Sequence, residues 1–240
     1  MTTSAPGSDP QPTPSTNAYR STNAGPNKNA NTGTSAEDRT PQAVLQQLLD
    51  GNDRFVQGKA LGPHQDRDRL SSLTQGQAPK AVVLACSDSR VPVELLFDQG
   101  FGDVFVIRTA GEIVDMSVLA SLEFAVEGLG VSLVVVLGHE SCGAVKAASE
   151  AMSQGAVPES FQRVLVEKVA PSVMVARSEG HTTTDDYEKQ HVRSIVDHVV
   201  GRSPEITAKL ADCTVGVVGL RYLLENGQVE AVTARGVAMP

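Results

Sequence analysis

The chain lacks tryptophan, has few other aromatic residues and contains only three cysteines among its 240 residues. No apolar run reaches the roughly 18 positions that a membrane-spanning helix requires, so we expect no membrane partner. Basic residues are outnumbered, because 20 lysines and arginines stand against 28 acidic residues, a net charge of −8. This excess of negative charge argues against nucleic acid as a partner. Two of the three cysteines stand near histidine and aspartate, which favours metal binding over a disulfide.

The first 38 residues contain few large apolar side chains. They are mostly Ser, Thr, Asn, Pro, Gly and Ala, and such a segment cannot bury enough apolar surface to offset the entropy lost on ordering. We predict a disordered polar tail over residues 1–38 and a single folded domain over residues 39–240. A targeting sequence is the alternative for the tail, although arginine is sparse and no amphipathic helix is visible. Because no apolar segment typical of a secretory signal follows the start, we expect a cytoplasmic protein.

Short β-branched runs alternate with helical patterns along the rest of the chain. The runs at 81–85, 104–107 and 133–137 are apolar throughout, which is typical of strands buried on both faces. This alternation predicts an α/β fold, in which a mostly parallel central sheet is flanked by helices and preceded by an N-terminal helical arm. Helices are predicted from residue 41 to about 55, at 92–99, at 117–129, at 143–154 and over most of 158–212, with a break at 180–184.

Two other segments have their own signals. Residues 61–77 are predicted as a polar connection. Near the end of the chain, Asn226-Gly227 stands between the apolar runs 214–220 and 228–232, and an asparagine-glycine pair in that setting predicts a hairpin.

Two motifs come directly after two of the predicted strands. Residues 86–90 read Cys-Ser-Asp-Ser-Arg, and residues 138–143 read Gly-His-Glu-Ser-Cys-Gly. The carboxyl ends of parallel strands meet at one edge of a sheet, so we expect Cys86, His139 and Cys142 to lie together there. Thiolates with imidazole favour zinc, and three protein ligands leave a fourth position for water, as in catalytic zinc sites.

Three more residues bear on this site. Asp88 and Arg90 are two positions apart, so in extended backbone they point to the same side. An adjacent arginine lowers the pKa of a carboxyl group, which favours an ionised Asp88 beside the metal over an ordinary surface salt bridge. Cys213 stands among apolar neighbours, and we predict a small buried hydrophobe. If Cys213 were instead a fourth ligand, the site would be closed to chemistry.

At these residues the chain resembles the β-class carbonic anhydrases. The zinc signature of that family pairs a Cys-x-Asp-x-Arg motif with a later His-x-x-Cys-Gly motif. The similarity extends over residues 41–232 and includes the segments 101–111 and 217–222. It implies reversible hydration of carbon dioxide to bicarbonate and a proton, by hydroxide on one Zn²⁺ ion per chain. The implied zinc ligands are Cys86, His139 and Cys142.

The resemblance also implies roles for other residues. Asp88 and Arg90 would form the catalytic dyad, Gln77 would donate a hydrogen bond to the substrate, and Phe105 and Ala110 would line an apolar pocket for carbon dioxide. In this family the glutamine and the aromatic residue face the zinc of a neighbouring subunit, and the first helix clasps that neighbour. A homodimer or a dimer of dimers is therefore implied.

Several alternatives stay open at this point. A hydrolase of a carbon dioxide analogue, such as carbonyl sulfide or carbon disulfide, would use the same site chemistry, and a non-catalytic binding protein could keep the same fold. A switch in which Asp88 itself takes the fourth zinc position at low pH is also open. The sequence assigns no proton carrier. Four histidines are expected on the surface or in helices: His64, His181, His191 and His198.

Overall fold

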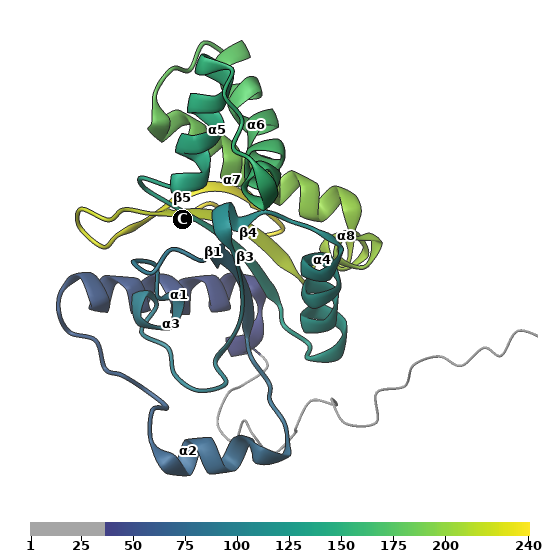
Figure 1. The fold of residues 1–240 in the computed structure, drawn as a ribbon. Helices are drawn as coiled ribbons and strands as arrows, with labels where there is room; N and C mark the ends of the chain where they lie inside the picture. The colour runs from purple at the N-terminus through teal and green to yellow at the C-terminus, as the bar shows by residue number, and fades with distance from the viewer. Residues whose placement is uncertain (1–36) are drawn as a thin grey trace, which may run out of the picture.

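The computed structural model describes residues 37–240, so residues 1–36 of the predicted tail lie outside the described part of the chain. The remainder of the predicted tail belongs to a short 3₁₀ turn, Glu37–Arg39. The described residues build a five-stranded sheet in the order β2-β1-β3-β4-β5, covered by helices on both faces (Figure 1). The predicted α/β class and the N-terminal helix are confirmed.

Four of the strands are parallel, as predicted. They are β1 (Ala81–Cys86), β2 (Val104–Thr109), β3 (Leu133–His139) and β4 (Gly216–Tyr222). The last strand, β5 (Val229–Arg235), runs antiparallel to β4 and completes the predicted hairpin. Every residue of β1, β3 and β4 is buried, whereas β2 at the edge is mostly half-buried. The apolar runs of the sequence therefore mark the strands covered on both faces.

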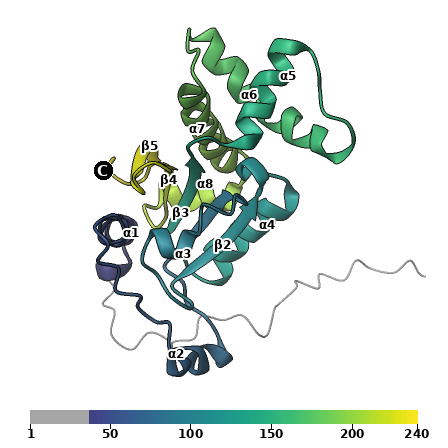
Figure 2. The same cartoon turned by 60° about the vertical axis from the view of Figure 1, so that its left-hand side comes forward.

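Helices cover the two faces of the sheet and one of its ends (Figures 1 and 2). The first face packs against α1 (Pro41–Val56) and α3 (Val93–Leu96). The second face packs against α4 (Met116–Glu123), α7 (Thr184–Arg202) and α8 (Pro204–Ala211).

Two further helices lie next to the carboxyl end of β1. These are α5 (Gly143–Gln154) and α6 (Arg163–Ser178), which pack on each other and on α7. Their buried side chains share one cluster with Cys86 and Cys142. The carboxyl ends of the strands are thus covered by a separate helical layer, which gives this edge of the sheet a buried interior.

Glycine lets α7 approach the sheet closely at two positions. A Cβ atom on Gly138 of β3 would lie 2.4 Å from Cγ2 of Val192, and one on Gly219 of β4 would lie 2.7 Å from Cγ1 of the same valine. Real Cβ atoms do not come so near, so any larger residue would push α7 away. Because Gly138 precedes His139, this contact fixes the height of α7 over the end of β3.

Two local predictions are corrected by the structure. The predicted polar connection contains a helix, α2 (Arg67–Ser72), which begins because the Asp66 side chain accepts a hydrogen bond from the Arg69 backbone N–H. The helix expected over 117–129 changes after α4 into a π-helical turn, Phe124–Gly128. Within residues 37–240, none of the helices combines the length and apolarity needed to cross a bilayer.

Candidate metal centre

The end of the sheet brings together the three predicted metal ligands. Cys86 is the last residue of β1, His139 is the last residue of β3, and Cys142 is the N-cap of α5. Their donor atoms lie within 4.8 Å of one another, and all three side chains are buried. Ser141, in the turn between His139 and Cys142, has a positive φ of 57°. That sharp turn returns Cys142 toward the histidine it follows.

The imidazole of His139 shows that the residues fit a metal ion. Its Nδ1 lies 2.8 Å from the carbonyl oxygen of Glu140, and a carbonyl only accepts, so Nδ1 carries the proton. The other nitrogen, Nε2, is buried and has no hydrogen-bond partner among the described residues. An unpartnered buried acceptor costs free energy, and a metal ion would satisfy this one. Two sulfurs and one imidazole nitrogen suit zinc.

The two thiols are electrostatically coupled. A hydrogen bond from the Cys142 thiol lowers the pKa of Cys86 to about 3, against the opposing effect of burial. The same hydrogen bond raises the pKa of Cys142. Without an ion, these opposite shifts favour a thiolate at Cys86 and a protonated thiol at Cys142. A cation that accepts both sulfurs would release that proton, because metal ligands bind as thiolates.

Asp88 and Arg90 form a bidentate pair beside the three ligands. Arg90 Nε donates to Asp88 Oδ1 at 2.9 Å, and its Nη2 donates to Oδ2 at 2.7 Å. These bonds hold the pKa of Asp88 well below its usual range. Asp88 Oδ2 also lies 4.0 Å from His139 Nε2. An ionised carboxylate therefore stands beside the free nitrogen of the site.

Arg108 and Gly111 also support the cysteine loop, and the sequence analysis assigned neither of them a role. The Arg108 guanidinium donates to the carbonyl oxygens of Cys86, at 2.9 Å, and of Asp88, at 2.6 Å. The Gly111 backbone N–H donates to Cys86 Sγ at 3.2 Å. The sequence does contain a signal for Arg108, because it is a charged residue directly after the apolar run 104–107. This run belongs to β2, which pairs with β1, the strand that carries Cys86.

A second charged network lies behind Cys142. The Glu188 carboxylate accepts the Cys142 backbone N–H at 3.0 Å and pairs with Arg221 at 2.8 Å. Both side chains of this pair are 3% exposed, and Arg221 also contacts Glu230 and Asp185 at 2.6 Å. Such a pair is costly to break from one side, because the remaining charge is left buried. The sequence signal for this network was Arg221, a charged residue inside the otherwise apolar strand β4.

Glu112 is another buried carboxyl group near the site. Its side chain is almost fully buried, and its Oε2 has no hydrogen-bond partner in the described region. Burial raises the pKa of Glu112 to about 8, and the charge of Cys86 adds to this effect. Without a metal ion, the group is therefore mostly protonated at neutral pH.

The predicted substrate residues divide into two groups. Ala110 directly precedes Gly111 and is exposed beside the metal ligands. Gln77 is exposed before the first residue of β1, at the opposite end of the strand from Cys86. Phe105 lies near the start of β2, where its ring is 6.2 Å from that of Phe124. Of these three residues, only Ala110 lies near the candidate metal ligands of its own chain.

Cys213 is exposed, so the prediction of a buried residue is wrong. It lies in the turn between α8 and β4 with a positive φ of 56°, and its backbone N–H is bonded to Leu210. This turn precedes β4, which is parallel to β1, and so lies at the edge of the sheet opposite to Cys86. Cys213 therefore does not close the metal site.

Comparison with known proteins agrees with this geometry. A family model described as carbonic anhydrase matches residues 81–229. A carbonic anhydrase of Mycolicibacterium smegmatis is 50% identical over 190 residues, which cover 79% of this chain and 92% of that protein. The chain therefore belongs to the carbonic anhydrase family, which supports carbon dioxide hydration as its activity.

Solved structures assign the class within the family. The β-carbonic anhydrase CcaA is 26% identical with a TM-score of 0.62, and the alignment covers 78% of this chain and 94% of that one. One of two tetrameric β-carbonic anhydrases from Sordaria macrospora is 25% identical with a TM-score of 0.63, over 80% and 99% of the two chains. This chain is therefore a carbonic anhydrase of the β class.

Proposed function

We propose that this enzyme binds one Zn²⁺ ion through Cys86 Sγ, His139 Nε2 and Cys142 Sγ, and hydrates carbon dioxide there. One observation carries the proposal: three buried donor atoms lie within 4.8 Å of one another, and the imidazole nitrogen among them has no hydrogen-bond partner within residues 37–240. Zinc bound to these atoms would supply Lewis acidity, which makes water a nucleophile at moderate pH. Three protein ligands leave a tetrahedral ion one position for solvent.

Asp88 is the proposed proton acceptor and orienting group for the attacking water. Its carboxylate stays ionised because Arg90 donates two hydrogen bonds to it. Oδ2, which lies nearer to His139 Nε2, can accept a hydrogen bond from water at the open side of the site. For Asp88 to take the fourth zinc position itself, this bidentate pair would have to rearrange. The pair is formed in this structure, which supports the role in catalysis.

The substrate pocket is proposed to form between two copies of the chain, with Gln77 and Phe105 supplied by the neighbour. Three observations support a dimer of this kind. Gln77 is exposed at the wrong end of β1 to serve its own chain. β2 is the sheet edge in the described region. Near it, the apolar side chains of Met116 and Phe124 are 83% and 40% exposed, which is typical of an interface.

Residues 39–240 are proposed to act as one catalytic domain, since a single continuous sheet runs through them. The cytoplasm is the proposed compartment. The site needs the thiols of Cys86 and Cys142 free, and a reducing environment keeps them so.

Stopped-flow measurement of carbon dioxide hydration tests this proposal, on protein whose zinc content has been measured. We expect a rate proportional to bound zinc and abolished when a chelator removes the metal. Carbonyl sulfide and carbon disulfide should be compared in parallel. If zinc-loaded protein hydrolyses either analogue faster than it hydrates carbon dioxide, the proposed substrate is wrong.

A further inference from the structure

One turn of α7 contacts the segments that carry His139 and Cys142, and also the Gly111 loop, which donates a hydrogen bond to Cys86. Glu188 accepts the backbone N–H of Cys142 at 3.0 Å. Val192 sits against Gly138, directly before His139. His191 lies between them in sequence and hydrogen-bonds the carbonyl oxygen of Gly111 at 2.8 Å. Residues three and four apart share one helix face, so this face of α7 is the common support of the site.

One residue, Gly111, connects His191 to Cys86, because its carbonyl oxygen contacts His191 and its N–H contacts Cys86 Sγ. A carbonyl oxygen only accepts, so His191 Nε2 donates to Gly111, and the other nitrogen, Nδ1, accepts from the Ser172 hydroxyl at 2.9 Å. Burial lowers the pKa of His191, which favours this neutral tautomer. The Gly111 N–H in turn donates to Cys86 Sγ. A continuous chain of hydrogen bonds and backbone thus runs from α6 through α7 to the thiolate.

Gly111 needs this support because its conformation is specialised. It has a φ of +68°, and a Cβ atom there would lie 2.6 Å from Cβ of Ala144 on α5. The loop must therefore be held in a left-handed conformation against α5 for its N–H to reach the sulfur. The hydrogen bond from His191 holds the carbonyl side of the same residue.

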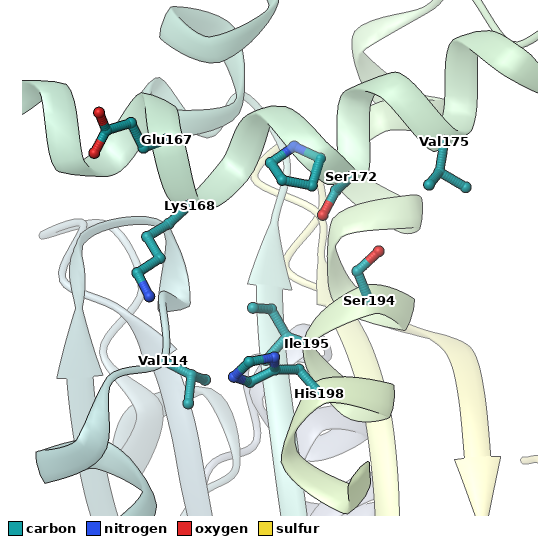
Figure 3. A pocket seen from close by; sticks show the side chains of 9 residues that line it. Val114, Glu167, Lys168, Ser172, Val175, Ser194, Ile195 and His198 are labelled. Atoms are coloured by element: carbon teal, nitrogen blue, oxygen red, sulfur yellow. The ribbon is translucent and has the colours of Figure 1, made fainter. Parts of the chain in front are cut away.

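Ser172, at the outer end of this series of hydrogen bonds, borders a cavity. None of the proposed metal ligands lines that cavity. The cavity measures about 280 Å³ and lies between α6 and α7, where Ser172 lines it together with Ser194, Ile195 and His198 (Figure 3). The Ser172 side chain itself is 3% exposed, as is expected of a hydroxyl committed to a buried hydrogen bond. His191 is fully buried behind it.

We propose that His191 is a positioning residue of the metal centre. By fixing Gly111, it orients the N–H that contacts Cys86 Sγ and sets the position of the sulfur for zinc before the ion binds. This inference rests on the proposed zinc site. The competing explanation is that His191 only fills the core, in which case its removal would lower the stability of the fold without changing metal affinity.

Two amide substitutions separate these explanations. In His191→Gln, the side-chain nitrogen can still reach the Gly111 carbonyl but loses Ser172. In His191→Asn, one methylene shorter, the amide can still reach Ser172 but not Gly111. A control, Val199→Ala, removes a fully buried side chain two turns further along α7, away from the loops. For each purified protein, zinc dissociation constants come from chelator competition, and unfolding temperatures from the metal-free form.

We expect His191→Asn to weaken zinc binding by about 10- to 100-fold, the usual effect of removing a group that orients a metal ligand. His191→Gln should retain most of the affinity of the parent. With cobalt in place of zinc, the sulfur-to-metal charge-transfer band should shift in the Asn variant and not in the Gln variant. Val199→Ala should lower the unfolding temperature and leave zinc affinity unchanged.

Equal zinc affinity of the Asn variant and the parent would overturn the inference, and so would equal losses in the Asn and Gln variants. If His191→Asn does not fold, the ¹⁵N chemical shifts of His191 in the parent decide instead: the inference requires the proton on Nε2, and a proton on Nδ1 contradicts it. A parent that binds no zinc would reject the proposed metal site itself. Failure of the site and failure of the inference are thus distinguishable.

Discussion

The metal end of the sheet and its β2 edge differ in how far contacts within one chain bury and hold the residues proposed to act there. At the metal end, each proposed ligand is buried, and contacts from the same chain hold both cysteines and the histidine. At the β2 edge, Phe105 is only half-buried, Gln77 is exposed, and apolar side chains such as Met116 face solvent.

This difference indicates that the metal site can form within one chain, whereas the proposed substrate pocket needs a second chain. One chain supplies all three proposed metal ligands. Two of the three predicted substrate residues, Gln77 and Phe105, belong to a surface that one chain leaves open. Variants at the two places should therefore behave differently in metal analysis, in kinetics and in mixing experiments.

The largest effect is expected at the metal end. Cys86→Ala removes one of three ligands and should abolish stoichiometric zinc. Hydration activity should fall by more than about 1,000-fold, because most of the rate enhancement depends on the metal. Elemental analysis and stopped-flow assays on the same sample measure both quantities. Full zinc occupancy in this variant would show that the ion is held elsewhere.

Asp88→Asn should separate catalysis from metal binding. The amide keeps the shape of the side chain but carries no charge and cannot accept a proton. We expect normal zinc content and a loss of about 10²- to 10⁴-fold in kcat, the usual contribution of a positioned acid–base group. Retention of the parent rate at full zinc occupancy would exclude the proposed role of the pair with Arg90.

Gln77→Ala tests whether the open edge is completed by a neighbour. Zinc content should stay normal while kcat/KM falls by about 10-fold, the value of one hydrogen bond to a reacting group. Mixing this variant with Cys86→Ala should then restore activity, because a mixed dimer contains one site with intact ligands and the partner's glutamine. Mixing without any gain would place Gln77 in its own chain's site or outside catalysis.

Glu112→Gln should change the pH dependence of stability. In the metal-free protein the pKa of Glu112 is raised to about 8 by burial, so the folded state binds a proton that the unfolded state releases above its ordinary pKa. This contribution is complete at low pH and is lost as the pH rises through about 8. The neutral amide removes that loss, so the unfolding temperature of Glu112→Gln should fall less between pH 6 and pH 9. Parallel curves for parent and variant would contradict a neutral Glu112.

The smallest effect is expected for Cys213→Ser. The residue is exposed at the edge of the sheet opposite to the metal ligands, so zinc content, activity and unfolding temperature should match those of the parent. A loss of zinc would mean that Cys213 reaches the ion.

Sequence patterns predicted the metal end well for a physical reason. The apolar runs identified buried parallel strands, and parallel strands end at one edge, so Cys86 and His139 had to meet there. Supporting groups such as Arg108 and His191 were not assigned, since their partners are backbone atoms of loops distant in sequence. The position of Arg108 after an apolar run marks it as unusual, but backbone partners leave no side-chain pattern that identifies which loop it contacts.

Local errors have equally specific causes. Asp66 begins a short helix inside a polar segment, where hydrophobic periodicity gives no signal. Cys213 was misplaced because its apolar neighbours belong to the next strand, while its own left-handed turn directs it to solvent. The roles of Gln77 and Phe105 stay predictions, because both residues lie at the end of the sheet opposite to Cys86.

X-ray absorption spectroscopy of zinc in the purified protein tests the central claim most directly. The structure predicts one zinc per chain with two sulfur ligands, one imidazole nitrogen and one further light atom, from Cys86, Cys142, His139 and solvent. Absence of stoichiometric zinc, or a shell with three sulfurs, would contradict the account.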